Sequence, residues 1–275
     1  MSKWLFGVVV RQNRGRGRMF MRTRTILTLG VAAVIVAPSA SCQYTDSGSP
    51  RPAASSSSSS ARPTDTGTLS PAPSTPAPAA GPLVQMDQLK GLLPSASEVS
   101  AAVNVPNLAI SESHDALSLL PDDYVSDMSC VGAIADAAIQ PYSETPVVSV
   151  RSQDYTPADG SNSLTVITSA VLYEAAQDAL DQVAATVTGW HACAGKSVQV
   201  KSTPTSTFTI GTEVVTNDLH TLTDTGTAPP DWSCGRGITS RNNVVIDLTV
   251  CGKDAAAVRA NAQGLLSQIS SKVPA

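Results

Sequence analysis

The chain has 275 residues, enough for one or two domains, and its formal net charge is only −4. Only 15% of the residues are charged, which argues against a nucleic-acid-binding protein, since such a protein carries a basic patch. Aromatic residues are scarce at 4%, so the core must be built from small aliphatic side chains.

Residues 1–41 are predicted to be a secretory signal peptide. Residues 26–37 form a run of 12 mostly apolar residues without charge, and two arginines stand just before it. The run is short for a transmembrane helix and has the length of a signal-peptide core. Met19 or Met21 would give a more ordinary signal peptide, which favours a later start of translation over an unusually long positively charged region.

Cys42 comes directly after the small residues Ser39, Ala40 and Ser41, and two interpretations of it compete. In the first, the segment resembles a bacterial lipobox, although Ser39 stands where leucine is usual, and the thiol of Cys42 carries a diacylglycerol. In the second, the protein is secreted and Cys42 is free or removed. Five cysteines leave one without a disulfide partner, which favours the lipid anchor and a place on the outer face of the cell membrane.

Residues 42–82 are predicted to be a disordered tether behind this anchor. Residues 43–82 contain 8 proline and 10 serine residues and almost no large apolar side chain. Such a segment buries too little surface to offset the entropy of ordering it. As a flexible coil it would span roughly 40 Å, and it would hold a folded domain away from the membrane.

The apolar residues recur with helix or strand periodicity only within residues 83–275. These residues are predicted to form one domain with its own core. Its first helix is predicted after Ser95, because Ser95 and Glu98 have the spacing of a capping box. Val99 and Val103, four residues apart, would form the apolar side of this helix.

Strands and helices then follow in runs. Residues 146–155 and 163–173 are rich in β-branched residues and predict strands, as do residues 198–201, 205–216, 219–223 and 243–250. Residues 174–193 predict a helix with one apolar stripe, formed by Ala176, Leu180, Val183, Val187 and Trp190. A last helix is predicted after Asp254, with a stripe formed by Val258, Ala262, Leu265 and Ile269. This order favours an α+β domain with helices packed on an antiparallel sheet.

Four cysteines, Cys130, Cys193, Cys234 and Cys251, fall in this domain and are expected to form two disulfides in an exported protein. Three pairings are open to them. A metal site is the weaker alternative, because there is no Cys-x-x-Cys pair and His191 is the only histidine near a cysteine.

In several segments the sequence resembles the extracellular sensor domain of mycobacterial PknH-type serine/threonine kinases, in the form found on lipoproteins without a kinase. The segments are LLPSASEVSAAV, PDDYVSDMSCVGA, the pair Pro141–Tyr142, VVSVRSQDY, GWHAC and CGRGI followed by NVVIDLTVCG. The resemblance covers nearly all of residues 83–275. It implies a central antiparallel sheet with flanking helices that enclose a cleft, and the disulfides Cys130–Cys193 and Cys234–Cys251.

Catalytic constellations are hard to find. The sequence has no Gly-x-Ser-x-Gly, no His-Glu-x-x-His and no phosphate-binding glycine loop, so no catalytic residue, cofactor or metal is predicted. His191 is expected to be structural at a helix end, and His220 to lie at the surface of a strand. Asp122, Asp123 and Asp127 form an acidic cluster that matches no calcium loop and is expected to be solvated.

Arg236 is the one candidate ligand-binding residue. It lies between Gly235 and Gly237, and this arrangement could present its guanidinium to a phosphate or carboxylate. The competing interpretation is a turn whose glycines adopt positive φ, with the arginine in water.

A membrane-tethered binding module is the favoured function. It would capture an unidentified small-molecule, glycan or lipid ligand of the cell envelope, with no nucleic-acid partner; the oligomeric state is left open. The alternative is an envelope hydrolase or transferase, which would need a nucleophile within hydrogen-bond reach of His191 or His220. A purely structural surface protein is a third possibility, and an open apolar cleft would count against it.

Overall fold

The computed structural model describes residues 81–202, 205–226 and 232–275. The predicted signal peptide, Cys42 and almost all of the predicted tether lie outside these ranges. Within them, no helix has both the length and the apolar character needed to cross a membrane.

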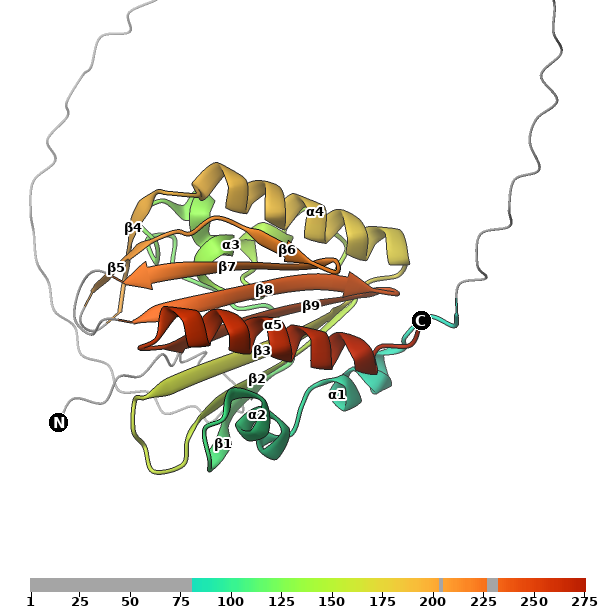
Figure 1. The fold of residues 1–275 in the computed structure, drawn as a ribbon. Coiled ribbons are helices and arrows are strands. Elements are labelled where there is room, and N and C mark those ends of the chain that lie inside the picture. Colours follow the sequence, from blue (N-terminus) through green and yellow to red (C-terminus); the bar gives the residue numbers. More distant parts are fainter. Residues whose placement is uncertain (1–80, 203–204, 227–231) are drawn as a thin grey trace, which may run out of the picture. The chain divides into compact units, whose positions relative to one another are not determined.

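The described residues form an α+β domain around one antiparallel sheet, as expected (Figure 1). The strand order is β1-β2-β3-β9-β8-β7-β5-β4, and β6 pairs with β7. The strands are β1 (Leu108–His114), β2 (Ser149–Pro157), β3 (Leu164–Leu172), β4 (Ser197–Val200), β5 (Ser206–Thr209), β6 (Val214–Thr216), β7 (Leu219–Gly226), β8 (Ser233–Arg241) and β9 (Val244–Gly252).

Helices cover both faces of this sheet. Helices α1 (Leu89–Leu92), α2 (Ala96–Val103) and α5 (Ala255–Lys272) pack on one face, and Figure 1 shows α5 running along β8 and β9. Helices α3 (Val131–Ile134) and α4 (Ala176–Cys193) pack on the other face. Short 3-10 helices complete the described elements: Met86–Gln88, Met128–Cys130 and Gln140–Tyr142.

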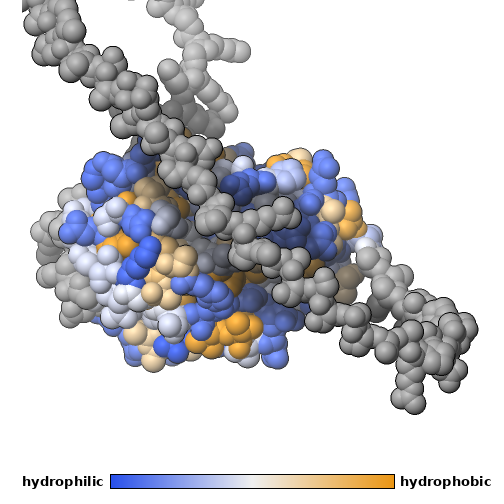
Figure 2. Space-filling view, turned by 90° about the horizontal axis from the view of Figure 1, so that it is seen from above, coloured by the Kyte–Doolittle hydropathy of each residue, from blue (hydrophilic) through white to orange (hydrophobic). Residues whose placement is uncertain are grey.

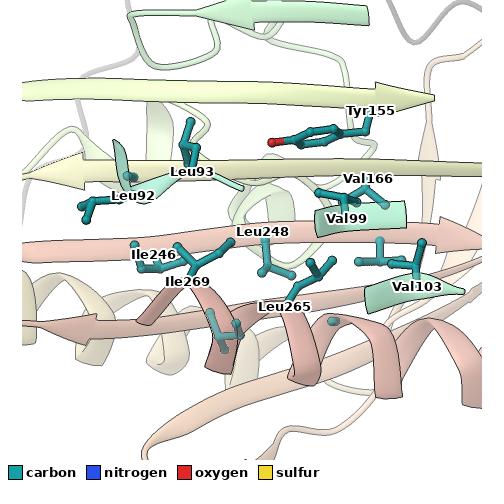
Figure 3. Packing of buried hydrophobic residues seen from close by; sticks show 14 of the residues in the cluster. Leu92, Leu93, Val99, Val103, Tyr155, Val166, Ile246, Leu248, Leu265 and Ile269 are labelled. Carbon is teal, nitrogen blue, oxygen red and sulfur yellow. The ribbon is translucent and has the colours of Figure 1, made fainter. Parts of the chain in front are cut away.

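The central strand β9 is covered on both faces, which explains its nearly continuous apolar sequence. Side chains alternate along it: Ile246 and Leu248 lie in the cluster under α5, whereas Val245 packs in the cluster under α4. Leu265 and Ile269 of α5 meet the first of these groups, with Val99 and Val103 of α2 beside them (Figure 3).

Helices α2 and α5 form where the sequence predicts them, and their caps are present. The Ser95 side chain accepts a hydrogen bond from the Glu98 backbone N–H, and the Glu98 carboxylate accepts one from the Ser95 N–H at 2.6 Å. Asp254 caps α5 by accepting hydrogen bonds from the N–H groups of Ala256 and Ala257. All four residues of the predicted α5 stripe are buried.

The predicted stripe of α4 is wrong in its first half. Leu180 is 54% exposed, and Ala179 is buried in its place. Strands β1 and β8 were not predicted, and the predicted strand 205–216 is two separate strands, β5 and β6. The expected turn at Gly235–Arg236–Gly237 is wrong, because these residues lie inside β8.

Gly235 and Gly237 are glycines because α5 lies directly against β8. A Cβ atom on Gly235 would stand 2.5 Å from the carbonyl oxygen of Val258, and one on Gly237 would stand 3.3 Å from Cδ2 of Leu266. Neither glycine has a positive φ. The two positions therefore serve close packing of a helix on a strand, and not a turn.

Replacing Gly235 with alanine is predicted to lower the free energy of unfolding by about 3 kcal/mol, the upper end for overpacking, because the clash is with backbone. Gly264 lies on α5, the helix that packs against Gly235, and no atom is near the position of a Cβ atom on it. Gly264→Ala should therefore raise the free energy of unfolding by about 0.5–1 kcal/mol. Urea unfolding followed by circular dichroism measures both. Equal effects of the two substitutions would contradict the packing argument.

Candidate functional site

The face of the sheet opposite α5 carries a group of buried polar side chains. They come from neighbouring strands and include Asp224 on β7, Arg236 on β8, and Asp247 and Thr249 on β9. Asp136, from the segment after α3, lies over them. Seen from the side of α4, the visible surface is mixed, with small hydrophobic patches among hydrophilic residues (Figure 2).

Arg236 is at the centre of this group and is fully buried. Its Nη2 lies 2.8 Å from Oδ1 of Asp247, and its Nη1 donates hydrogen bonds to the Leu248 carbonyl at 2.6 Å and to Thr249 Oγ1 at 2.8 Å. Its guanidinium also lies 5.8 Å from the ring centre of Trp190. The carboxylate that this arginine binds is therefore the protein's own.

The ion pair fixes the segment that follows α3. Asp247 accepts hydrogen bonds from the Ala137 N–H and the Tyr142 hydroxyl, both at 2.9 Å. Arg236 Nη2 donates to the Gly132 carbonyl at 3.1 Å. Burial raises the pKa of Asp247 and the guanidinium lowers it; the short ion pair to an arginine favours the ionised carboxylate.

Two further buried carboxyl groups flank the pair, and they differ in their partners. Asp136 accepts hydrogen bonds from Ser169 Oγ and Thr249 Oγ1, each at 3.0 Å. Asp224 is 1% exposed, and neither of its carboxyl oxygens accepts a hydrogen bond of normal geometry; the Gly211 backbone makes only a weak contact with it. Burial raises the pKa of Asp224 to about 8, although Arg236 and the nearby backbone of Gly211 lower it.

A cavity of about 80 Å³ opens beside these acids. Asp136 and Asp224 line it, together with apolar side chains that include Ile134, Ile167 and Phe208. Most of its exposed wall is apolar, and a few polar groups converge on it. This combination is typical of a small-molecule binding site.

A second, larger hollow of about 590 Å³ lies between α4 and the segment before β2. Its wall includes the acidic residues Glu144, Asp178 and Asp181, with Glu144 and Asp181 exposed to solvent. It is a more polar groove than the cavity beside Asp224.

Both disulfides form as expected. Cys130–Cys193 joins the segment before α3 to the last residue of α4, and its Cα atoms are 5.6 Å apart. Cys234–Cys251 links directly paired residues of β8 and β9 and lies in the wall of the cavity. With all four cysteines in disulfides, the alternative of a cysteine metal site is excluded for them.

His191 and His220 share one partner, Glu213. His191 Nε2 lies 2.5 Å from one carboxylate oxygen, and His220 Nδ1 contacts the other. The Glu213 pKa is lowered, because these contacts outweigh the effect of its burial. Neither histidine has a serine, threonine or cysteine as a hydrogen-bond partner among the residues that the structure describes, so the nucleophile expected of a hydrolase is not found here.

The acidic cluster before Cys130 is held by lysines. Asp123 pairs with Lys201, and Asp127 lies 3.1 Å from Lys196 Nζ while also accepting a hydrogen bond from Ser129. These contacts turn the aspartates toward different partners, so they do not converge on a common cation.

A different group could hold a metal ion, and no motif in the sequence indicates it. Ligand atoms of Glu112, His114 and Asp154 lie within 4.8 Å of one another. An irregularity in β1 between Ile110 and Glu112 shifts the register and brings Glu112 opposite Asp154. Burial and the neighbouring carboxylates raise the pKa of Asp154 to about 7.

Comparison with known proteins agrees with this architecture. A model of the PknH-like extracellular domain family matches residues 84–272. The extracellular domain of PknH from Mycobacterium tuberculosis is similar in structure, with a TM-score of 0.63 and 23% identity, over 70% of this chain and 99% of that chain. At this identity, the likeness shows the fold alone.

A putative uncharacterized protein from Mycobacterium smegmatis has a TM-score of 0.33 and 11% identity over 64% of this chain and 98% of its own. That score is too low to carry an argument. No curated protein sequence matches the chain.

Asp224→Asn is predicted to stabilise the protein at neutral and alkaline pH. The folded state holds a proton on Asp224 up to about pH 8, whereas an unfolded aspartate releases it near pH 4, so the wild type loses stability as the pH rises between these values. The gain from the substitution should be close to zero at pH 4 and at least ~2 kcal/mol at pH 8. Urea unfolding at both pH values measures it.

The matched control for this experiment is Asp181→Asn, which removes an exposed carboxylate from the groove beside α4. It should change the free energy of unfolding by less than about 0.5 kcal/mol at either pH. A loss of stability in the Asp224 variant at pH 8 would show that the ionised carboxylate has a stabilising partner.

Proposed function

Because the chain belongs to the PknH-like extracellular domain family, we propose that it is a binding module that captures a ligand of the cell envelope in the cavity beside Cys234–Cys251. The observation that carries the proposal is the cavity itself. It combines an apolar wall with a buried carboxyl group, Asp224, that accepts no hydrogen bond of normal geometry within the protein. Buried polar groups in folded proteins nearly always have partners, and exceptions call for a functional explanation.

We propose a non-catalytic role for the domain. The two histidines that a hydrolase or transferase would use both bind Glu213, and both Nη atoms of the central cation, Arg236, are engaged by Asp247, Thr249 and backbone carbonyls. These contacts make the enzymatic alternative the weaker one. The domain is of an extracellular family, and its disulfides suit an oxidising compartment.

We further propose that a lipid on Cys42 anchors the protein to the outer face of the membrane. The odd number of cysteines supports this, because the four in the domain pair with one another and leave Cys42 over. The proline- and serine-rich segment after Cys42 would let the domain reach ligands roughly 40 Å from the membrane as a flexible coil.

Filling the cavity should abolish ligand binding. Ala135 lines the cavity, so Ala135→Phe places a ring in it. We expect lipid and soluble fractions of the cell envelope to raise the melting temperature of the wild type by several degrees and to leave that of the variant unchanged. Differential scanning calorimetry with each fraction makes the measurement.

Ala184→Phe is the matched control, because Ala184 is exposed on α4 and does not line the cavity. It should respond to the fractions as the wild type does. A shift that persists in Ala135→Phe would place the ligand elsewhere and refute binding in this cavity.

The proposed lipid anchor predicts a specific mass for the N-terminal peptide of the mature protein. In protein extracted from its native membrane, the N-terminal peptide should begin at a diacylated Cys42, and four alkylatable thiols should appear only after reduction. Mass spectrometry with and without reduction tests both points. A soluble product with an unmodified N-terminal peptide would overturn the lipid anchor, and free thiols before reduction would contradict the two disulfides.

A further inference from the structure

We infer that the ligand of this cavity carries a protonated amine on a small apolar group, and that Asp224 is the partner of the ammonium. The inference rests on the proposed function, since it names the class of ligand for the same cavity. Three observations carry it: the balance of charge around the cavity, the missing partners of Asp224, and the apolar wall.

The buried charges near the cavity do not balance. Asp136, Asp224 and Asp247 supply three carboxyl groups, whereas Arg236 is the one buried cation among the described residues. The guanidinium pairs with Asp247, and through the hydroxyl of Thr249 it is linked to Asp136. This network is complete without Asp224.

Three other cations near this end of the sheet are already engaged, and a fourth, Lys253 just beyond β9, is exposed to solvent. Lys196 and Lys201, which flank β4, pair with Asp127 and Asp123. Arg259 of α5 donates a hydrogen bond to Thr223, whose side chain is on the opposite face of β7 from Asp224. Asp224 is therefore left as a buried carboxyl group whose two oxygens have no hydrogen bond of normal geometry and no ion pair.

An ammonium supplies what Asp224 lacks, a positive charge and up to three hydrogen-bond donors. Away from water, such a charge-assisted hydrogen bond is stronger than a neutral one. An alcohol would offer one donor and no charge. A carboxylate would be repelled by Asp136, and it could not take up the negative charge that Asp224 gains when an ammonium displaces its proton. The surrounding carboxyl groups thus select for a cation.

The size of the cavity limits what enters it. A volume of about 80 Å³ is enough for a few water molecules, because one water needs roughly 10–15 Å³ by this measure, and it leaves room for an amine and a few carbon atoms. Ile134, Ile167 and Phe208 give those carbons an apolar contact. A larger ligand would place its amine-bearing end here and extend out of the mouth.

Three probes of equal length and different charge test the inference: hexylammonium, hexanol and hexanoate. Each is titrated into the full isotopically labelled chain at pH 7, and backbone amide shifts are followed by NMR. Hexylammonium is expected to bind at least ten times more tightly than hexanol and to shift amides at Ile167 and Phe208. Hexanoate is expected not to bind.

The variant Asp224→Asn should reduce the preference for hexylammonium over hexanol to about twofold or less. This substitution keeps the shape of the side chain, and the amide spectrum shows whether the variant is folded. Asp181→Asn removes an acid from the other groove and should keep the full preference. Glu112→Gln should also keep it, since Glu112 belongs to the separate group on β1.

Equal affinity for hexylammonium and hexanol would overturn the inference that the ligand carries an amine. It would leave the proposed function intact, since an apolar ligand would still occupy the cavity. Shifts confined to residues around Asp178 and Asp181, or a preference that survives in Asp224→Asn, would likewise overturn the amine inference. If none of the probes binds, the amine inference fails. The proposed function fails separately, if Ala135→Phe keeps its response to the envelope fractions.

Discussion

The buried ion pair between Arg236 and Asp247 is the constraint on which the rest of this face depends. Placing two charges away from water is costly, and additional hydrogen bonds to the pair offset part of that cost. Arg236 and Asp247 obtain such hydrogen bonds from Gly132, Ala137 and Tyr142. The segment after α3 has little regular structure of its own, so the ion pair holds it in place. That segment provides Ala135 and Asp136, which together with Ile134 at the end of α3 form one wall of the cavity.

The same network explains why Asp224 stands out. A single guanidinium pairs with Asp247 directly and is linked to Asp136 through Thr249, and none of its N–H groups is hydrogen-bonded to Asp224. A hydrophobic residue at position 224 would avoid the free-energy cost of burying an unpaired carboxyl group. Retaining an acid at a loss of stability is the pattern of a binding position, where the missing partner arrives with the ligand.

Local chemistry explains which parts of the fold were predictable. Helices α2 and α5 are predicted by their capping residues and by apolar residues that recur at the helical spacing of 3.6. Both helices lie where expected. Strand β8 has Gly-Arg-Gly in its middle, which is typical of a turn, and only the packing of α5 accounts for the glycines. The cavity joins Asp136 and Asp224, which are 88 residues apart on elements whose pairing the sequence does not encode locally. The disulfide pairing came from the family resemblance, since spacing alone left three choices.

Burial, rather than size, distinguishes the two hollows of this domain. The groove beside α4 is several times larger, but Glu144 and Asp181 on its wall are exposed, so water already solvates them and a cation gains little by binding there. In the small cavity, Asp224 is shielded from water, and its electrostatic attraction to a cation is correspondingly stronger. Because the unligated carboxyl group is raised to a pKa of about 8, it is mostly protonated at pH 7, and binding an ammonium must release that proton. Selectivity for a cation and a dependence on pH therefore have one origin: Asp224 is buried without a well-formed hydrogen bond or ion pair within the protein.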